Sequence, residues 1–548
     1  MTILFIARHF TYFRNFESVV VSLAERGHRV HLAADREEAQ GGRDLVDGLA
    51  ARFPTRVTVG FAPILQWGRY RRVAGALRLT LDYLRYSDPR YEDTPKIRAR
   101  AYERTPYAAL LLARLPWRGA VTRALERLEQ AVPRQVGIDE FVAKLQPDVL
   151  LVTPLIELGS PQLDYVRAAR ALGIRSALCV WSWDHLSSKA LIRVVPDKVI
   201  VWNETQREEA QRFHGVPSDR VLVTGAQCFD KWFDRAPTRD RRALGARAGL
   251  DVTGPFLLYV CSALFKNSPL EAAFVRRWIE AIRRAADPRV RDVTILVRPH
   301  PQRLEEWEGV TASQLDPTER TVLWGSNPVD ADGQADYFDS MYHAAAVVGL
   351  NTSALVESAI VDRPVFTVLL PEYRDNQEGT FHFHHLLRVG DGFLNASRDL
   401  DAHVAQLRGV FDGQGLRPNR FFVEHFIRPR GAGVAATPVF VEALETFVTQ
   451  PAPRPQPTPG WVWGLRPVVY ALVLAGRVPI LERLYWNPVK RREVAENVEA
   501  IWHKGEQRRA KRRDKASRVV RKFGQQVVVR MKTAAKHALG DAGPTRPS

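Results

Sequence analysis

The chain is poor in cysteine and has no long uninterrupted apolar run. Its 548 residues include three cysteines, Cys179, Cys228 and Cys261, each in or beside an apolar stretch. They lack the spacing of a metal site and indicate buried thiols in a reducing compartment. The N-terminal MTILFIARHF has no charged n-region and too short an apolar core for a signal peptide. We therefore expect a first strand there and a cytoplasmic protein.

Positive charge is abundant but unevenly placed. The formal net charge is +18, and 13 Lys and Arg against two acidic residues lie between Ile501 and Leu539. This tail therefore carries 11 of the 18 net charges, and the remainder of the chain is only mildly basic. Such a distribution does not favour a nucleic-acid-binding protein, and we expect no nucleic-acid partner.

The dinucleotide fingerprint G-x-G-x-x-G is absent after the first expected strand. Strands and helices nevertheless alternate, which predicts parallel, doubly wound sheets. A first series has expected strands at 2–8, 29–33, 56–61, 148–153, 175–180, 198–202 and 220–224. A second has strands at 256–261, 293–297, 344–350 and 365–370 and is closed by a helix near 437–448. The expected fold class is α/β, with two Rossmann-like domains facing a cleft.

The expected domain organisation follows from these two series. An N-terminal domain spans 1–230, with a helical insert at about 70–145, and a C-terminal domain spans 231–450. A proline-rich linker, 451–460, precedes an aromatic and then basic helical tail, 461–548. Ser268-Pro269-Leu270-Glu271 has the pattern of an N-cap, a first-turn proline and a capping-box glutamate, so a helix is expected to begin at Ser268.

A polar turn between a buried strand and a helix is the main candidate site. Asn351, Thr352 and Ser353 follow the apolar run 344–350, and all three are N-cap residue types. A helix start directly after a parallel strand attracts anions. Glu357 lies one turn on, on the same helix face as Ser353, where a carboxylate suits a ribose diol. A capped surface helix with an ordinary glutamate is the alternative.

A second candidate is Arg298-Pro299-His300-Pro301, directly after the expected strand 293–297. The prolines keep this segment extended, so a cation and an imidazole stand at the carboxyl end of the strand. Both groups suit a pyrophosphate. The alternative is a stiff loop with a solvated arginine.

These two motifs carry a family resemblance. RPHP after a strand, followed by NTSALVESAIVDRP at 351–364, resembles the nucleotide-binding domain of GT-B glycosyltransferases. The similarity is to the bacterial capsule-type and CDP-glycerol glycerophosphotransferase-like group and to the non-hydrolysing UDP-GlcNAc 2-epimerases. In architecture it covers about residues 1–445.

The resemblance implies roles for these residues. Arg298 and His300 would contact the donor phosphates, Asn351, Thr352 and Ser353 would bind phosphate at the helix start, and Glu357 would bind the ribose. It also implies transfer without a metal or a cofactor, because the helix dipole and cationic side chains stabilise the leaving nucleoside diphosphate.

The acceptor side is expected in two loops of the N-terminal domain. In inverting GT-B enzymes a base often stands after the first strand, which makes His9 a candidate, although a loop histidine without a role is the alternative. The segment 181–189 offers indole faces for a sugar ring and polar groups for its hydroxyls. Its candidates for sugar or acceptor contact are Trp181, Trp183, His185 and Lys189. Asp184 is the second candidate base, and tryptophan packing at a domain edge is the alternative for this segment.

The loop 372–385 is the donor-sugar candidate, again by resemblance. Its expected contacts are Gln377, Glu378, Thr380 and His382. His382, His384 and His385 do not form a standard metal set, and Asp330-Ala331-Asp332 lies in a loop rather than at a strand end, so neither predicts a metal site.

The tail predicts a membrane-surface partner. The segment 461–486 is aromatic and apolar but is interrupted by arginines and prolines, which favours an interfacial or packed segment over a spanning helix. The basic run after it suits anionic lipid. Nucleic acid and a merely solvated tail are the alternatives. The membrane is preferred because a lipid-linked acceptor requires it, and contact through 461–540 is expected.

Together these features predict a glycosyltransferase of cell-surface polysaccharide synthesis. It would move a sugar or alditol phosphate from a nucleotide-activated donor to a hydroxyl of a glycan or lipid-linked acceptor, at the inner face of the plasma membrane. A nucleotide-sugar epimerase of the same fold and a non-catalytic nucleotide-sugar or nucleic-acid-binding protein are the alternatives.

Overall fold

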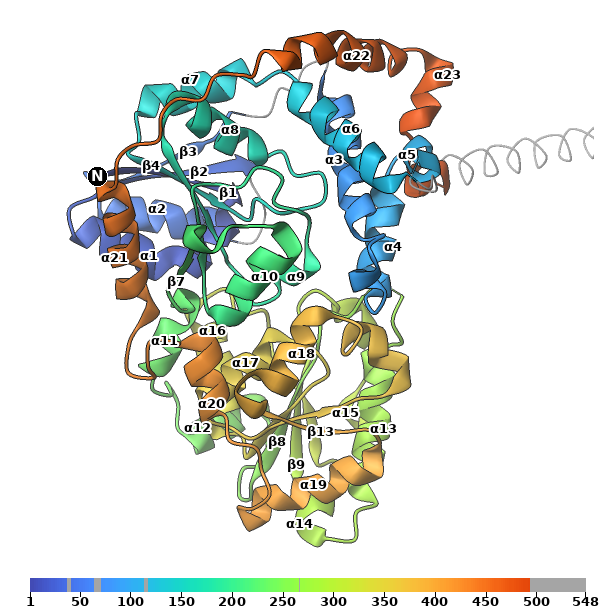
Figure 1. The fold of residues 1–548 in the computed structure, drawn as a ribbon. Helices are drawn as coiled ribbons and strands as arrows, with labels where there is room; N and C mark the ends of the chain where they lie inside the picture. The colour runs from blue at the N-terminus through green and yellow to red at the C-terminus, as the bar shows by residue number, and fades with distance from the viewer. Residues whose placement is uncertain (37–40, 64–69, 113–116, 266, 493–548) are drawn as a thin grey trace, which may run out of the picture. The chain divides into compact units, whose positions relative to one another are not determined.

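The computed structural model describes residues 1–36, 41–63, 70–112, 117–265 and 267–492 (Figure 1). Residues 1–485 form one compact unit, and a second unit begins at Trp486. The basic run 501–539 lies outside the described residues, so its predicted helical structure stays a prediction.

The first sheet has seven parallel strands in the order β3-β2-β1-β4-β5-β6-β7. Its strands are β1 Thr2–His9, β2 Arg29–Arg36, β3 Val57–Phe61, β4 Val149–Thr153, β5 Arg175–Cys179, β6 Lys198–Val201 and β7 Val221–Val223. The strand order reverses between β1 and β4, and the side chains of β1 alternate between two separate hydrophobic clusters, so both faces of the sheet are covered.

The second sheet has six parallel strands in the order β10-β9-β8-β11-β12-β13. They are β8 Phe256–Val260, β9 Thr294–Arg298, β10 Thr321–Leu323, β11 Ala346–Val348, β12 Val365–Val368 and β13 Leu394–Ser397. The order reverses between β8 and β11. The predicted class, two doubly wound Rossmann-like sheets, is therefore confirmed.

Helices connect the strands and cover both sheets. Those before β8 are α1 Glu17–Glu25, α2 Gly42–Arg52, α3 Arg71–Arg85, α4 Pro95–Arg104, α5 Tyr107–Leu112, α6 Arg118–Ala131, α7 Val136–Leu145, α8 Leu163–Leu172, α9 His185–Ser188, α10 Glu204–His214, α11 Asp230–Phe233 and α12 Arg241–Ala248. Those after it are α13 Glu271–Arg283, α14 Pro288–Arg291, α15 Ala312–Leu315, α16 Ala331–His343, α17 Ser353–Ile360, α18 Phe381–Arg388, α19 Leu400–Asp412, α20 Arg420–Phe422, α21 Ala436–Thr449, α22 Trp461–Ala475 and α23 Pro479–Glu482.

The helix predicted near 437–448 exists as α21, but it packs on the first sheet and does not close the second. Phe440, Val441 and Leu444 join the cluster that covers one face of β1. The Asp230 carboxylate accepts hydrogen bonds from the backbone N–H groups of Ala436 (2.9 Å) and Thr437 (2.7 Å), which fixes the start of α21. The chain therefore crosses back to the first sheet after the second is complete.

The helix start predicted at Ser268 is wrong. Helix α13 begins at Glu271, and its N-cap residue Leu270 provides no side-chain bond. The Glu271 carboxylate is buried and accepts instead from the N–H of Ser262 (2.7 Å) and the hydroxyl of Tyr259 (2.9 Å). Glu271 therefore fixes the loop after β8.

The apolar segment after the proline-rich linker forms α22, which packs on α3 and α6. Within the described ranges, every helix is too short or too polar to cross a membrane.

Candidate functional site

A cavity of about 830 Å³ opens at the carboxyl ends of strands from both sheets. The loop after β5 lines it from the first sheet, and the loops after β8, β9 and β11 line it from the second. This is where open α/β sheets bind ligands. The structure brings together most of the residues predicted from the sequence: Trp181, Trp183, Asp184, Lys189, Arg298, His300, Asn351, Thr352, Ser353, Glu357, Thr380 and His382.

Two of the predicted histidines are not among the described residues of the cavity lining. His9 ends β1, and its ring packs against that of Tyr12 at a centroid distance of 4.5 Å. His185 is fully buried, and its Nε2 donates to the Pro154 carbonyl at 2.8 Å. Burial lowers the pKa of His185 to about 3. His185 therefore acts as a core residue.

Gln377 and Glu378 are likewise outside the described lining. The Gln377 amide donates to the carbonyls of Leu350 and Val368, both at 3.1 Å, and so ties the loop after β12 to the sheet. Glu378 pairs with Arg398 at 2.9 Å. The loop contributes Thr380 and His382 to the cavity instead.

The start of α17 has the predicted cap. Thr352 is in an extended conformation, and its hydroxyl accepts from the N–H of Ala354 at 3.4 Å, so the helix begins at Ser353. The Ser353 hydroxyl accepts from the indole Nε1 of Trp183 at 3.3 Å. The helix start thus contacts a residue from the loop after β5. Its remaining N–H groups and its dipole favour an anion at the cavity wall.

Glu357 and Arg298 meet at Tyr337 of α16. The Tyr337 hydroxyl donates to Glu357 at 2.5 Å. Burial raises the pKa of the Glu357 carboxyl to about 7, against the lowering effect of this bond. The Arg298 guanidinium lies 5.5 Å from the Tyr337 ring centroid and 5.2 Å from that of Trp324. Burial lowers the pKa of Arg298.

Arg298 is more enclosed than a solvated phosphate ligand. Its side chain is 5% exposed, and it donates to the Ser340 hydroxyl at 3.1 Å. Gly325 has φ +140°, and a Cβ there would lie 2.7 Å from the Arg298 Cζ. The glycine therefore allows the guanidinium to lie flat against the backbone. Arg298 lines the cavity wall and contacts Tyr337, the hydrogen-bond partner of Glu357.

Asp184 is held by an ion pair rather than left available as a base. Its carboxylate accepts from Lys189 Nζ (2.9 Å), from the Ser182 hydroxyl (2.6 Å) and from the Ser188 hydroxyl (2.8 Å). Burial alone would raise the pKa of Asp184, but Lys189, His382 and these hydrogen bonds lower it below its usual value. A carboxylate so stabilised accepts a proton poorly.

His382 also lines the cavity, but burial weakens its imidazole as a base. Its ring meets the Trp183 ring edge-on at a centroid distance of 4.8 Å, and its Nε2 is 3.4 Å from the Thr380 hydroxyl. Among the described residues its buried Nδ1 has no hydrogen-bond partner. Burial lowers the pKa of His382 to about 4, so the imidazole is neutral at pH 7.

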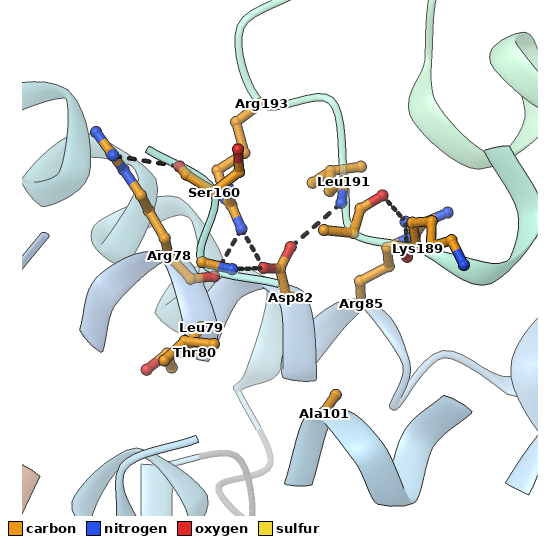
Figure 2. A network of polar contacts seen from close by, with 12 residues as sticks. Arg78, Leu79, Thr80, Asp82, Arg85, Ala101, Ser160, Lys189, Leu191 and Arg193 are labelled. Atoms are coloured by element: carbon orange, nitrogen blue, oxygen red, sulfur yellow. Dashed lines mark hydrogen bonds and ion pairs between the residues drawn. The ribbon is translucent and has the colours of Figure 1, made fainter. Parts of the chain in front are cut away.

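The helical insert fixes the wall that carries Lys189 (Figure 2). Asp82 of α3 accepts from the N–H groups of Leu191 (3.2 Å) and Gly159 (2.9 Å) and pairs with Arg193 at 2.5 Å. Arg85 donates to the carbonyl of Ala190 at 2.6 Å. One face of α3 therefore determines the path of the chain directly after the Asp184 loop.

Sequence reasoning missed Tyr337, Asp82 and Arg85. Tyr337 lies in a helix 20 residues before Glu357, and its role follows from a side-chain hydrogen bond between α16 and α17. Asp82 and Arg85 are three residues apart on a helix whose spacing predicts only a shared face. No local pattern marks their partners.

The three histidines near residue 384 point to separate partners. His384 Nε2 donates to the Glu378 carbonyl, and His385 Nε2 contacts Glu209, both at 2.8 Å. Across the described ranges, no group of three or more His, Cys, Asp or Glu side chains is placed to hold a metal ion.

No protein-family model and no curated protein sequence matches the chain. Solved structures do resemble it. The UDP-GlcNAc 2-epimerase of Methanocaldococcus jannaschii is 11% identical with a TM-score of 0.47, over 82% of this chain and 100% of that one. A Rickettsia africae glycosyltransferase is 10% identical with a TM-score of 0.48, over 82% and 99%. The lipopolysaccharide outer core galactosyltransferase WaaB is 10% identical with a TM-score of 0.43, over 82% and 100%. By name, one of these three proteins is an epimerase and two are glycosyltransferases.

Proposed function

We propose that this protein is a GT-B-type glycosyltransferase. It moves a sugar or alditol phosphate from a nucleotide-activated donor to a hydroxyl of a glycan or lipid-linked acceptor in cell-surface polysaccharide synthesis. One observation carries the proposal: a single cavity joins the capped start of α17, His300 and the Tyr337–Glu357 pair to the loop that bears Trp181, Trp183 and Lys189.

The donor half binds the nucleoside diphosphate. The start of α17, with Thr352 and Ser353, receives the phosphates, and His300 and Arg298 add hydrogen-bonding and positive charge. Glu357, one turn into the helix, accepts from the ribose hydroxyls. These groups stabilise the negative charge that develops on the leaving group, which is a nucleoside diphosphate when a sugar is moved and a nucleoside monophosphate when an alditol phosphate is moved.

The acceptor half lies on the side of the first sheet. Trp181 lines the cavity, where an indole face suits a sugar ring. We assign His382, which lines the cavity, to contact with the acceptor; His9 lies outside the described lining. Asp184 holds Lys189 in place.

The test is a transfer assay with a panel of UDP-, CDP-, GDP- and dTDP-activated donors and mixed glycan and lipid-linked acceptors. Release of a nucleoside diphosphate, or of a nucleoside monophosphate from a nucleotide-alditol, supports the proposal if it requires an acceptor, is lost in Glu357→Gln and His382→Gln, and is kept in the exposed-helix control Glu442→Gln. Conversion of the donor sugar without an acceptor identifies an epimerase instead. If no nucleotide binds and both variants behave as wild type, a role at this cavity is refuted.

A further inference from the structure

Helix α22 is apolar on both of its sides. Val462, Val469 and Val473 are buried against α3 and α6. On the other side, Trp463 is 61% exposed and Val468 46% exposed. A helix that is apolar all round is normally enclosed, so the outward side of α22 faces an environment that its composition does not suit.

The same character continues through the elements next to α22. Ile480 of α23 is 72% exposed and Leu484 is 48% exposed. The 3₁₀ turn Arg483–Tyr485 packs against α5, whose Leu111 and Leu112 are also exposed. Trp117, at the start of α6, is 71% exposed. We call the exposed apolar side chains of α5, Trp117, α22, α23 and this turn the apolar face.

The charges on this face are basic and suit an anionic surface. Arg477 follows α22 and Arg483 follows α23, and both are exposed. Between residues 461 and 485 the acidic side chain is Glu482, and Arg72 neutralises it at 3.0 Å. Exposed Trp and Tyr with arginines that extend past them are the composition of helices at a lipid–water interface.

We propose that the apolar face docks on the surface of an anionic lipid bilayer, with α22 and α23 in the headgroup region and not across the membrane. The docking itself is independent of the proposed transfer reaction. The proposed function enters only if the acceptor is also taken to be lipid-linked, because the docked membrane would then supply it. The docking extends the membrane contact expected from residues 461–540 to α5 and the start of α6, far earlier in the chain.

A second copy of the chain is a poorer occupant. A symmetric contact through this face would bring two basic surfaces together, with Arg477 and Arg483 on each, and like charges oppose association. An anionic bilayer offers both an apolar layer for the indole rings and phosphates for these arginines.

The experiment compares two triple variants of the full-length chain. Trp463→Ser, Ile480→Ser and Leu112→Ser remove three side chains of the apolar face. Val136→Ser, Leu270→Ser and Phe421→Ser remove three equally exposed apolar side chains from elsewhere. Each protein is sedimented with vesicles of phosphatidylcholine, with and without phosphatidylglycerol, at low and high salt. High salt screens any attraction through the basic residues 501–539 and leaves apolar contact in place.

We expect wild type and the control triple to bind the phosphatidylglycerol vesicles, and the face triple to bind about tenfold or more weakly at high salt. Tryptophan fluorescence should be quenched by brominated lipid in wild type and much less in the face triple. Equal binding of all three proteins overturns the inference. So does sedimentation equilibrium that shows a wild-type dimer, lost in the face triple, without vesicle binding. The thermal shift caused by nucleotide should be the same in wild type and in the face triple. A loss of vesicle binding in the face triple therefore tests the docking and not the proposed function.

Discussion

Glu357 is the group for which stability and function should conflict. A carboxyl whose pKa rises from 4.5 to about 7 on folding loses up to about 3 kcal/mol of stability once it ionises. Because the side chain is only half-buried, solvent screens its charge, and we expect ionisation of Glu357 to cost about 1–3 kcal/mol of folding stability. Glu357→Gln removes the charge and keeps an oxygen that can accept from the Tyr337 hydroxyl.

The sign of the pH dependence follows from the raised pKa. Between pH 4.5 and about 7 the folded wild type retains a proton that the unfolded chain has released, so wild-type stability falls as pH rises through this window. The amide of Glu357→Gln does not titrate. The free energy of unfolding of the variant should therefore equal that of wild type near pH 4.5. Above about pH 7 it should be larger by about 1–3 kcal/mol.

Denaturation melts across this pH range, with Glu442→Gln as the exposed control, measure the difference. Under the proposed function the same variant should bind the donor nucleotide about 10- to 100-fold more weakly, because a charged acceptor is replaced by a neutral one. A stability difference that does not change with pH would refute the reasoning, since it would mean that Glu357 does not titrate in this window.

Four further changes test neighbouring parts of the site. Tyr337→Phe removes the bond that lowers the pKa of Glu357, so the pH midpoint of nucleotide binding should move up, and binding titrations at several pH values check this. Gly325→Ala should cost about 1–3 kcal/mol by displacing Arg298 and straining φ, whereas Gly254→Ala, with open space around it, should be near neutral in the same melts. Asp184→Asn removes the carboxylate that pairs with Lys189, and at neutral pH it should destabilise the protein by about 1–3 kcal/mol. Because the pKa of Asp184 is lowered on folding, this difference in stability should shrink as pH falls below about 4. Asp82→Asn should speed amide hydrogen exchange at 189–193 without affecting exchange in β8, and equal rates in variant and wild type would contradict the role given to α3.

The parts of the structure that depend on local sequence were predictable. Apolar runs bounded by turn residues marked most of the strands but not β10 and β13, and cap residue types marked the start of α17 at Ser353. The parallel order within each sheet followed from strand–helix alternation, because right-handed crossovers leave few arrangements. Two motifs at strand ends, at His300 and Ser353, were sufficient to place the cavity at the carboxyl edge of the sheets.

Failures occurred where a side chain has two possible partners and tertiary contacts choose between them. The capping pattern at Ser268 and Glu271 is locally sound, but a buried hydroxyl and a backbone N–H in the loop after β8 bind Glu271 more favourably. The amide of Gln377 similarly binds the sheet rather than facing the cavity. Helix α21 follows the second sheet in sequence, yet its apolar face matches the first. The pairing of Tyr337 with Glu357 joins two helices, and sequence spacing carries no signal for it.

The measurement that tests the central claim most directly is a thermal-shift titration with UDP, CDP, CMP, GDP and dTDP. A ligand at about 100 times its dissociation constant stabilises the folded state by about 2.7 kcal/mol. We predict a saturable shift with one of these nucleotides, strongly reduced in Glu357→Gln and His300→Ala and retained in Glu442→Gln. No shift with any nucleotide, or a shift that both cavity variants retain in full, would contradict the assignment of this cavity to a nucleotide-activated donor.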